Sequence, residues 1–292
     1  WQRGTTSANN TYGADRWRGS SVTSQAQSTD VPNDSFAYSN AASGSGGVAG
    51  AIGTPIELQV TGKSAPFKQS TNFTFSGYFK GTAGQTLSLR LRYRDGMFGT
   101  NSQEILAGTV IVTFDGTWQY VTKTVDFGSS VDVVGTSKCL ELILIHNTAD
   151  ATWYQTGCQF EVGDTATDFE HRSYAEELSA CQRYYEKILA DPSSSYIGIS
   201  AGTIYGSGTY LGHFTASVPM RVTPTFSTNA YGNASRMSVV SGADTYAVSS
   251  IAVTGNNQRL RINGSGSLSG IVGQGAYIQV QNGYHVAFEA EL

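Results

Sequence analysis

The sequence comprises 292 residues, of which 14% are charged, and its formal net charge is −4. This charge argues against nucleic acid as the main partner, because neutralising phosphates requires a basic surface. No segment approaches the roughly 18 consecutive apolar residues that a membrane-spanning helix requires. The 34 Gly, 16 Tyr and 13 Phe are typical of β-sheets joined by tight turns.

Residues 1–168 predict a first domain built from short strands. Apolar and polar residues alternate there in four segments, 72–80, 87–94, 118–125 and 139–146. Residues 139–145 are apolar on both faces, which predicts a strand in the middle of a sheet. Residues 40–53 are rich in Gly, Ala and Ser and predict a long loop. No helical period interrupts the strands, so a β-sandwich is favoured over a parallel sheet.

Residues 169–191 predict a single connecting helix. Its apolar residues are spaced alternately by four and three positions, at Tyr174, Leu178, Cys181, Tyr185 and Ile188. The spacing is that of a coiled-coil seam, which would align parallel copies of the chain along this helix. The pattern covers little more than two heptads, so a helix packed alone on one of the chain's own β domains is an equal alternative. Pro192 is expected to end the helix, because proline cannot continue its hydrogen-bond ladder.

Residues 192–292 predict a second, sandwich-like β domain. Short strand-like segments return here, among them 196–200, 210–218, 245–253 and 276–280. The expected fold is therefore all-β, with two domains joined by one helix.

Arg90, Arg92 and Arg94 share one face of a predicted strand. Three cations cannot enter a dry core unpaired, so this face is expected to meet solvent, another subunit or a ligand. As a ligand site it would suit an acidic polysaccharide, since guanidinium groups pair with carboxylates. An ordinary solvated face with carboxylates nearby is the favoured alternative.

Tyrosines outside the predicted core offer a second route to carbohydrate, because the C–H face of a sugar stacks on an aromatic ring. In the first domain the candidates are Tyr38, Tyr78, Tyr93 and Tyr154. In the second domain they are Tyr205, Tyr210, Tyr231 and Tyr246, which lie in Gly- and Ser-rich segments. The second group is the favoured ligand surface, whereas Trp118 and Trp153 are expected to fill the core.

Catalytic and cofactor signals are weak. The histidines show no metal-ligand spacing, and the carboxylates are scattered singly where glycoside cleavage needs a pair. The cysteines Cys139, Cys158 and Cys181 are expected to be small buried side chains. We therefore expect no enzyme and no cofactor, although Asp15, Asp30 and Asp34 could hold a structural Ca²⁺.

Residues 163–187 resemble a passage of bacteriophage tail-fibre and related virion appendage proteins. The matching positions are Glu161, Gly163, Ala166, Thr167, Phe169, Glu170, Arg172, Ser173, Tyr174, Glu177, Leu178, Cys181, Gln182, Arg183, Tyr184, Tyr185 and Lys187. Residues 1–4, 12–17 and 218–224 resemble further parts of these proteins, and residues 73–85, 115–119 and 142–162 resemble jelly-roll carbohydrate-binding modules. Because the sequence begins at Trp1, we expect it to be part of a longer protein.

The resemblance implies a jelly-roll first domain and a homotrimer. It implies a tail-fibre or receptor-binding subunit on the virion, assembled in the bacterial cytoplasm, that attaches without catalysis to host surface polysaccharide and contacts other virion proteins. Two alternatives remain open. The first is a structural head or tail decoration protein that contacts other virion proteins. The second is a polysaccharide depolymerase, which is disfavoured because such tailspikes usually show a long repetitive β-helix region.

Overall fold

The protein is described by a computed structural model that covers residues 6–8, 17–44, 46–47, 49–57, 72–94, 102–126, 139–189, 196–206, 208–227, 237–268, 272–281 and 285–290. The chain divides into two compact units, unit 1 (Arg3–His171) and unit 2 (Arg172–Glu291). Within the described part, the one helix is too short to cross a membrane.

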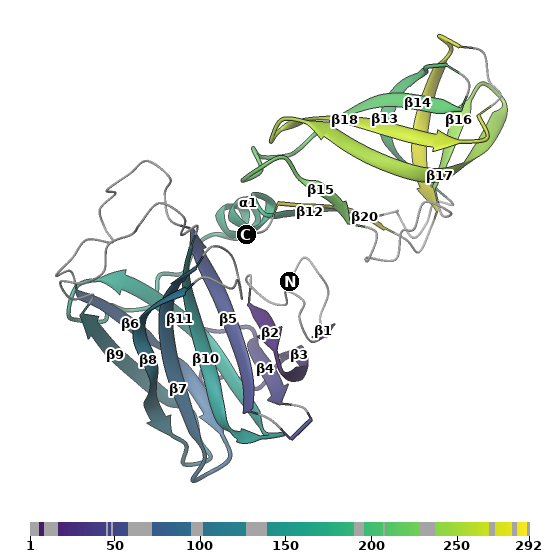
Figure 1. Ribbon diagram of the computed structural model, residues 1–292. Helices are drawn as coiled ribbons and strands as arrows, with labels where there is room; N and C mark the ends of the chain where they lie inside the picture. The colour runs from purple at the N-terminus through teal and green to yellow at the C-terminus, as the bar shows by residue number, and fades with distance from the viewer. Residues whose placement is uncertain are drawn as a thin grey trace. The chain divides into compact units, whose positions relative to one another are not determined.

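Unit 1 is a jelly-roll-like sandwich of two antiparallel sheets (Figure 1). The six-stranded sheet has the order β1-β3-β4-β11-β6-β9, and the five-stranded sheet has the order β2-β5-β10-β7-β8. The strands are β1 (Thr6–Ala8), β2 (Arg18–Ser20), β3 (Val22–Ser28), β4 (Ser39–Gly44), β5 (Ala49–Glu57), β6 (Asn72–Gly81), β7 (Thr86–Arg94), β8 (Ser102–Thr113), β9 (Gln119–Asp126), β10 (Cys139–Ala149) and β11 (Thr152–Val162). The expected all-β class and N-terminal sandwich are confirmed.

The core of unit 1 lies between the two sheets. Strand β6 contributes Phe73, Phe75 and Phe79, and β7 contributes Leu87, Leu89 and Leu91, all at most 1% exposed. Alternate residues of a strand point to opposite faces, so each of these strands sends one apolar row inward. Each fully buried side chain of this size stabilises the fold by about 1.5–3 kcal/mol.

Strand β10 is central in its sheet, as its apolar sequence predicts. It pairs with β5 on one side and β7 on the other. The expectation of a long loop over residues 40–53 is wrong, because this stretch forms β4 and the start of β5. Its small residues fit beside the fully buried Trp153: a Cβ added at Gly50 would lie 3.2 Å from the indole ring.

The helix α1 (Tyr174–Gln182) is shorter than the expected 169–191. Its first turn is held by a capping box, in which Ser173 Oγ accepts a hydrogen bond from Glu176 N and Glu176 Oε2 accepts one from Ser173 N. No helical residue is buried, and Tyr174 is 81% exposed.

The predicted coiled-coil seam is therefore wrong, because its five apolar residues do not lie on one helix. Tyr185 and Ile188 lie on β12 (Tyr185–Leu189), where they pair with residues of β20 (His285–Glu289). The partner strand satisfies the backbone groups that a longer helix would bond internally, and it buries Tyr185 to 5% exposure. Tertiary pairing thus overrides the helical period after Gln182.

The other strands of unit 2 form a closed barrel and a small sheet (Figure 1). The barrel order is β13-β14-β18-β17-β16-β19, and the sheet order is β12-β20-β15. The remaining bounds are β13 (Tyr196–Ile204), β14 (Thr209–Thr215), β15 (Thr225–Ser227), β16 (Met237–Ser241), β17 (Asp244–Gly255), β18 (Arg259–Gly266) and β19 (Gly275–Gln281). The sandwich-like domain expected here is thus an all-β unit whose main sheet closes on itself, because β13 pairs with β14 on one edge and β19 on the other.

Candidate functional site

The three strand arginines of unit 1 are engaged by carboxylates. Arg90 forms a bidentate salt bridge with Glu104, in which Nε donates to Oε1 at 2.6 Å and Nη2 donates to Oε2 at 2.7 Å. This hydrogen bonding raises the pKa of Arg90. Arg92 and Arg94 both contact Glu141, whose side chain is fully buried. Their own side chains are 13% and 9% exposed. The favoured expectation of a solvated face is therefore wrong at Arg92 and Arg94, which belong to a buried ion cluster.

The tyrosines expected to form a ligand surface in the second domain do not lie together. Tyr210 is fully buried, and its hydroxyl donates to Ser200 O at 2.6 Å. Burial raises the pKa of this hydroxyl. A Cβ added at Gly212 would lie 2.2 Å from Tyr210 Oη, so the sequence leaves room here for the ring inside the barrel. Tyr210 is thus a core residue, and its assignment to a ligand surface is wrong.

The other tyrosines of that group differ in exposure. Tyr205 is 64% exposed, whereas Tyr246 is half-buried with its hydroxyl 3.3 Å from Asp244 Oδ2. Tyr231 lies outside the described residues. Two barrel tyrosines that the sequence reasoning missed, Tyr196 and Tyr277, are 44% and 43% exposed.

Among the described residues, a group of partly exposed aromatic rings lies on the outer face of the six-stranded sheet of unit 1. Tyr78 of β6 pairs across the ladder with Tyr120 of β9, and their ring centroids are 4.8 Å apart. Phe36 packs on the other side of Tyr78 at 5.5 Å. Tyr120 is 48% exposed, so the row reaches solvent.

A charged pair lies beside these rings. Lys80 Nζ contacts Asp30 Oδ2 at 2.6 Å and sits 5.9 Å from the ring centroid of Tyr154. The indole Nε1 of Trp118 donates to Asp30 Oδ1 at 2.8 Å. Hydrogen bonds from Lys80 and then Trp118 lower the pKa of Asp30, so the carboxylate stays ionised. We call Tyr78, Tyr120, Trp118, Tyr154, Lys80 and Asp30 the aromatic face.

The loop between β3 and β4 brings Asp30, Phe36 and Tyr38 to this face. Thr156 Oγ1 donates to Tyr38 O at 3.0 Å, which ties the loop to β11. Gly157 has φ +58°, and a Cβ there would lie 2.8 Å from the Phe36 ring. Glycine is needed at this position both for its backbone conformation and for the close approach of the ring.

The segment that follows β11 runs beside the aromatic face. Phe169 and His171 lie 5.6 and 5.4 Å from Phe36, measured between ring centroids. Thr167 N donates to Glu161 Oε1 at 3.1 Å. These contacts hold residues 167–171 against the rest of unit 1.

Several expectations change at this site. Tyr78 and Tyr154 lie on the aromatic face, and Tyr38 is 50% exposed next to it. Tyr93 is 1% exposed, and burial raises its pKa to about 12, so its assignment to a ligand surface is wrong.

Trp153 fills the core as expected, but Trp118 does not, because it is half-buried on the outer face. Sequence reasoning also missed Tyr120, whose place among the polar positions of its strand was a usable signal.

Asp30 is bound by Lys80 and Trp118, and Asp15 lies outside the described residues. Among the described residues, no three His, Cys, Asp or Glu side chains cluster as metal ligands. The possible Ca²⁺ site remains a prediction.

The aromatic face combines flat rings with hydrogen-bonding groups. Rings offer apolar surfaces on which the C–H side of a sugar can stack, and nearby polar groups fix its orientation. The face is open and shallow, since Tyr120 and Tyr38 are about half exposed. Such an arrangement can bind an extended ligand at the surface.

Comparison with known proteins gives likenesses of fold. No protein-family model matches the chain, and no curated protein matches it. The xylan-binding domain CBM22-1 of Paenibacillus barcinonensis Xyn10C is 15% identical over 55% of this chain and 94% of that domain, with a TM-score of 0.36. The tandem CBM22-1-CBM22-2 of the same protein is 11% identical over 98% of this chain and 97% of its own, with a TM-score of 0.36. The enzymatically active domain of bacteriophage CBA120 tailspike protein 4 is 14% identical over 53% of this chain, has a TM-score of 0.36, and is itself covered over 20% of its length.

Proposed function

We propose that this chain binds a surface glycan through the aromatic face of unit 1. The observation that carries the proposal is the grouping of four aromatic side chains around the Lys80–Asp30 pair. The rings of Tyr78 and Tyr120 can stack on sugar rings, while Lys80 and Asp30 can hydrogen bond sugar hydroxyls. Shallow contacts of this kind are weak singly and gain strength when several copies act together.

The biological setting that we propose is a bacteriophage virion appendage, such as a tail fibre, that attaches to polysaccharide on a bacterial host. The resemblance of residues 163–187 to tail-fibre proteins supports this setting. A homotrimer would supply the several copies that weak glycan contacts require.

We propose that the binding is not catalytic. Glycoside cleavage uses two carboxyl groups, one of which has a raised pKa and donates a proton. At the aromatic face, Lys80 and Trp118 lower the pKa of Asp30. Further along β11, the side chains of Gln159 and Thr167 lower the pKa of Glu161. Carboxylates held ionised suit the positioning of a ligand better than proton donation.

The test is glycan-array binding of the full chain and of its Tyr120→Ala variant. Because the ring of Tyr120 is proposed to stack on the sugar, its truncation should cost about 1.4 kcal/mol of binding free energy, which weakens binding tenfold. Because Tyr120 is 48% exposed, this change should leave the fold intact. Circular dichroism checks that it does.

The matched control is Tyr277→Ala, which removes a tyrosine of 43% exposure from the barrel and should leave binding unchanged. Equal binding by wild type and Tyr120→Ala would move the site away from the aromatic face. Absence of glycan binding by the wild type would overturn the proposal in favour of a structural virion protein. Release of reducing ends from host polysaccharide would instead favour a depolymerase.

A further inference from the structure

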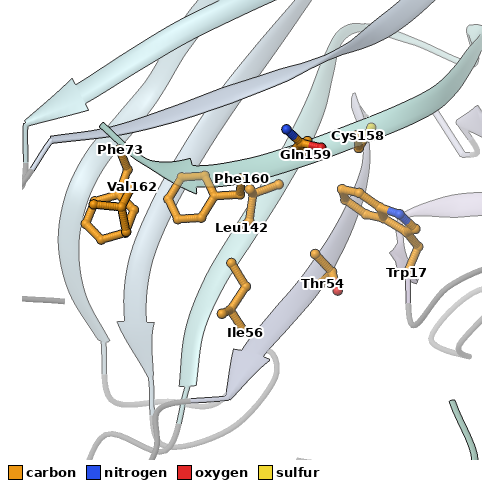
Figure 2. A pocket seen from close by; sticks show the side chains of 9 residues that line it. All are labelled: Trp17, Thr54, Ile56, Phe73, Leu142, Cys158, Gln159, Phe160 and Val162. Atoms are coloured by element: carbon orange, nitrogen blue, oxygen red, sulfur yellow. The ribbon is translucent and has the colours of Figure 1, made fainter. Parts of the chain in front are cut away.

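An apolar pocket of about 270 Å³ opens between the two sheets of unit 1 (Figure 2). Ile56 of β5 and Leu142 of β10 line it from one sheet, and Phe73, Phe160 and Val162 line it from the other. The indole of Trp17, which precedes β2, lies at one end of the pocket (Figure 2). Val162 is 54% exposed, so the pocket reaches the surface beside it.

The remaining lining residues offer few polar groups. Thr54 contributes a hydroxyl and Cys158 a thiol. The amide of Gln159 is engaged elsewhere: Nε2 hydrogen bonds to Glu161 and Thr167, and Oε1 accepts from Glu170 N at 3.0 Å. Among the lining residues that the structure describes, none carries a charged side chain. A charged ligand would lose its hydration here without compensation, so the lining selects uncharged molecules.

An irregularity in β11 creates this lining. The register of β11 against β6 shifts between Thr156 and Gln159, where Gly157 has φ +58°. Before the shift Trp153 faces the core, and after it Cys158 and Phe160 do. A strand that kept its two-residue period would turn Gln159 inward in their place. The bulge therefore exchanges a polar wall of the pocket for an apolar one.

The volume of the pocket indicates the size of its ligand. The pocket is open to the surface beside Val162, and its volume of about 270 Å³ exceeds the space that one water molecule fills. An engineered apolar cavity of about 150 Å³ stays dry and binds benzene. We propose that this pocket is a binding site for a small uncharged apolar molecule, of the size of a benzene ring with a short alkyl substituent. The site is separate from the glycan site, because it lies between the sheets and not on their outer face.

The test is thermal unfolding of the full chain in increasing toluene. A ligand that binds only the folded state raises the unfolding midpoint with its concentration, here on the order of 2–4 °C well above the dissociation constant. Thr54→Phe places a ring in the pocket and should abolish the shift. Val162→Trp blocks the opening from a half-exposed position, so it tests the site even where Thr54→Phe fails to fold.

The matched control is Thr113→Phe, the same substitution at an exposed position of β8. Toluene should raise the unfolding midpoint of this variant as much as it does that of the wild type. Tyr120→Ala should keep the toluene response too, which separates this pocket from the aromatic face. The proposal is overturned if toluene leaves the wild-type midpoint unchanged up to its solubility limit. It is also overturned if Val162→Trp responds as the wild type does.

Discussion

At the scale of residues, burial separates the tyrosines into core residues and surface residues. Tyr93 and Tyr210 are at most 1% exposed, whereas Tyr120 is 48% exposed. Tyr93 is in phase with the leucines of its strand and Tyr120 with the threonines of its strand, so the local pattern separates these two. Tyr210 lies between Thr209 and Leu211, where the pattern gives no such signal. Its burial comes from partners on other strands, such as Ser200 for its hydroxyl.

His146 is a second residue whose behaviour depends on its packing. It lies between Phe114 and Trp153, with ring centroids 5.7 and 5.3 Å away. Burial lowers its pKa below the ordinary value of 6.5, so the folded state disfavours the imidazolium form. Below about pH 6.5 the unfolded chain binds more protons at this residue, and stability should therefore fall on acidification.

The measurement is the urea-unfolding free energy of wild type and His146→Phe at about pH 7.5 and about pH 5. Protonation of His146 alone can change the unfolding free energy by at most about 1.4 kcal/mol per pH unit. Phenylalanine can stack between the same two rings and does not titrate, so the variant should lose less stability than the wild type between these pH values. Parallel losses in both proteins would show that His146 does not carry this dependence.

At the scale of elements, a buried ion cluster links β7 to β10. Arg92 and Arg94 on β7 share Glu141 on β10, and Glu141 is fully buried. We expect Glu141→Gln to lower the unfolding free energy by about 3–5 kcal/mol, because it leaves buried cations without their counter-charge. Urea unfolding measures the loss.

Glu104→Gln is the comparison for this prediction. Glu104 pairs with Arg90 where both side chains are about one-third exposed. Loss of this ion pair should therefore lower the unfolding free energy by less than about 1 kcal/mol. Similar costs for the two variants would mean that Glu141 is not the centre of a buried cluster.

The same scale explains why the helix was predicted too long. Tyr174, Leu178, Cys181, Tyr185 and Ile188 keep a helical period in sequence. The period does not reveal that β20, about 100 residues further along the chain, pairs with residues 185–189. Local spacing predicts a helix, and a distant strand supplies competing hydrogen bonds.

At the scale of the whole molecule, the predicted coiled-coil axis does not extend beyond α1. A coiled coil needs apolar residues along several turns of one helix, whereas α1 spans Tyr174–Gln182, and Tyr185 and Ile188 lie on β12. We expect Leu178→Glu to leave the mass of the assembly in solution unchanged, as measured by sedimentation equilibrium. Dissociation of an oligomer by this variant would restore the helix as the assembly axis.

The sequence by itself determined the all-β class, the central position of β10 and the core rows of β6 and β7. These follow from residue periods within single strands, which local sequence encodes directly. It also singled out Tyr78 and Tyr154 of the aromatic face, because both lie at outward positions of their strands.

Only the tertiary structure decided the rest of the site. Phe36 and Asp30 reach the aromatic face through a loop held to β11, and the Trp118 indole is directed outward to Asp30. The bulge at Gly157 determines which residues of β11 line the pocket. Closure of the second unit's main sheet into a barrel buries Tyr210 inside it. Each of these depends on contacts between residues far apart in sequence, and such contacts leave no period in the local pattern.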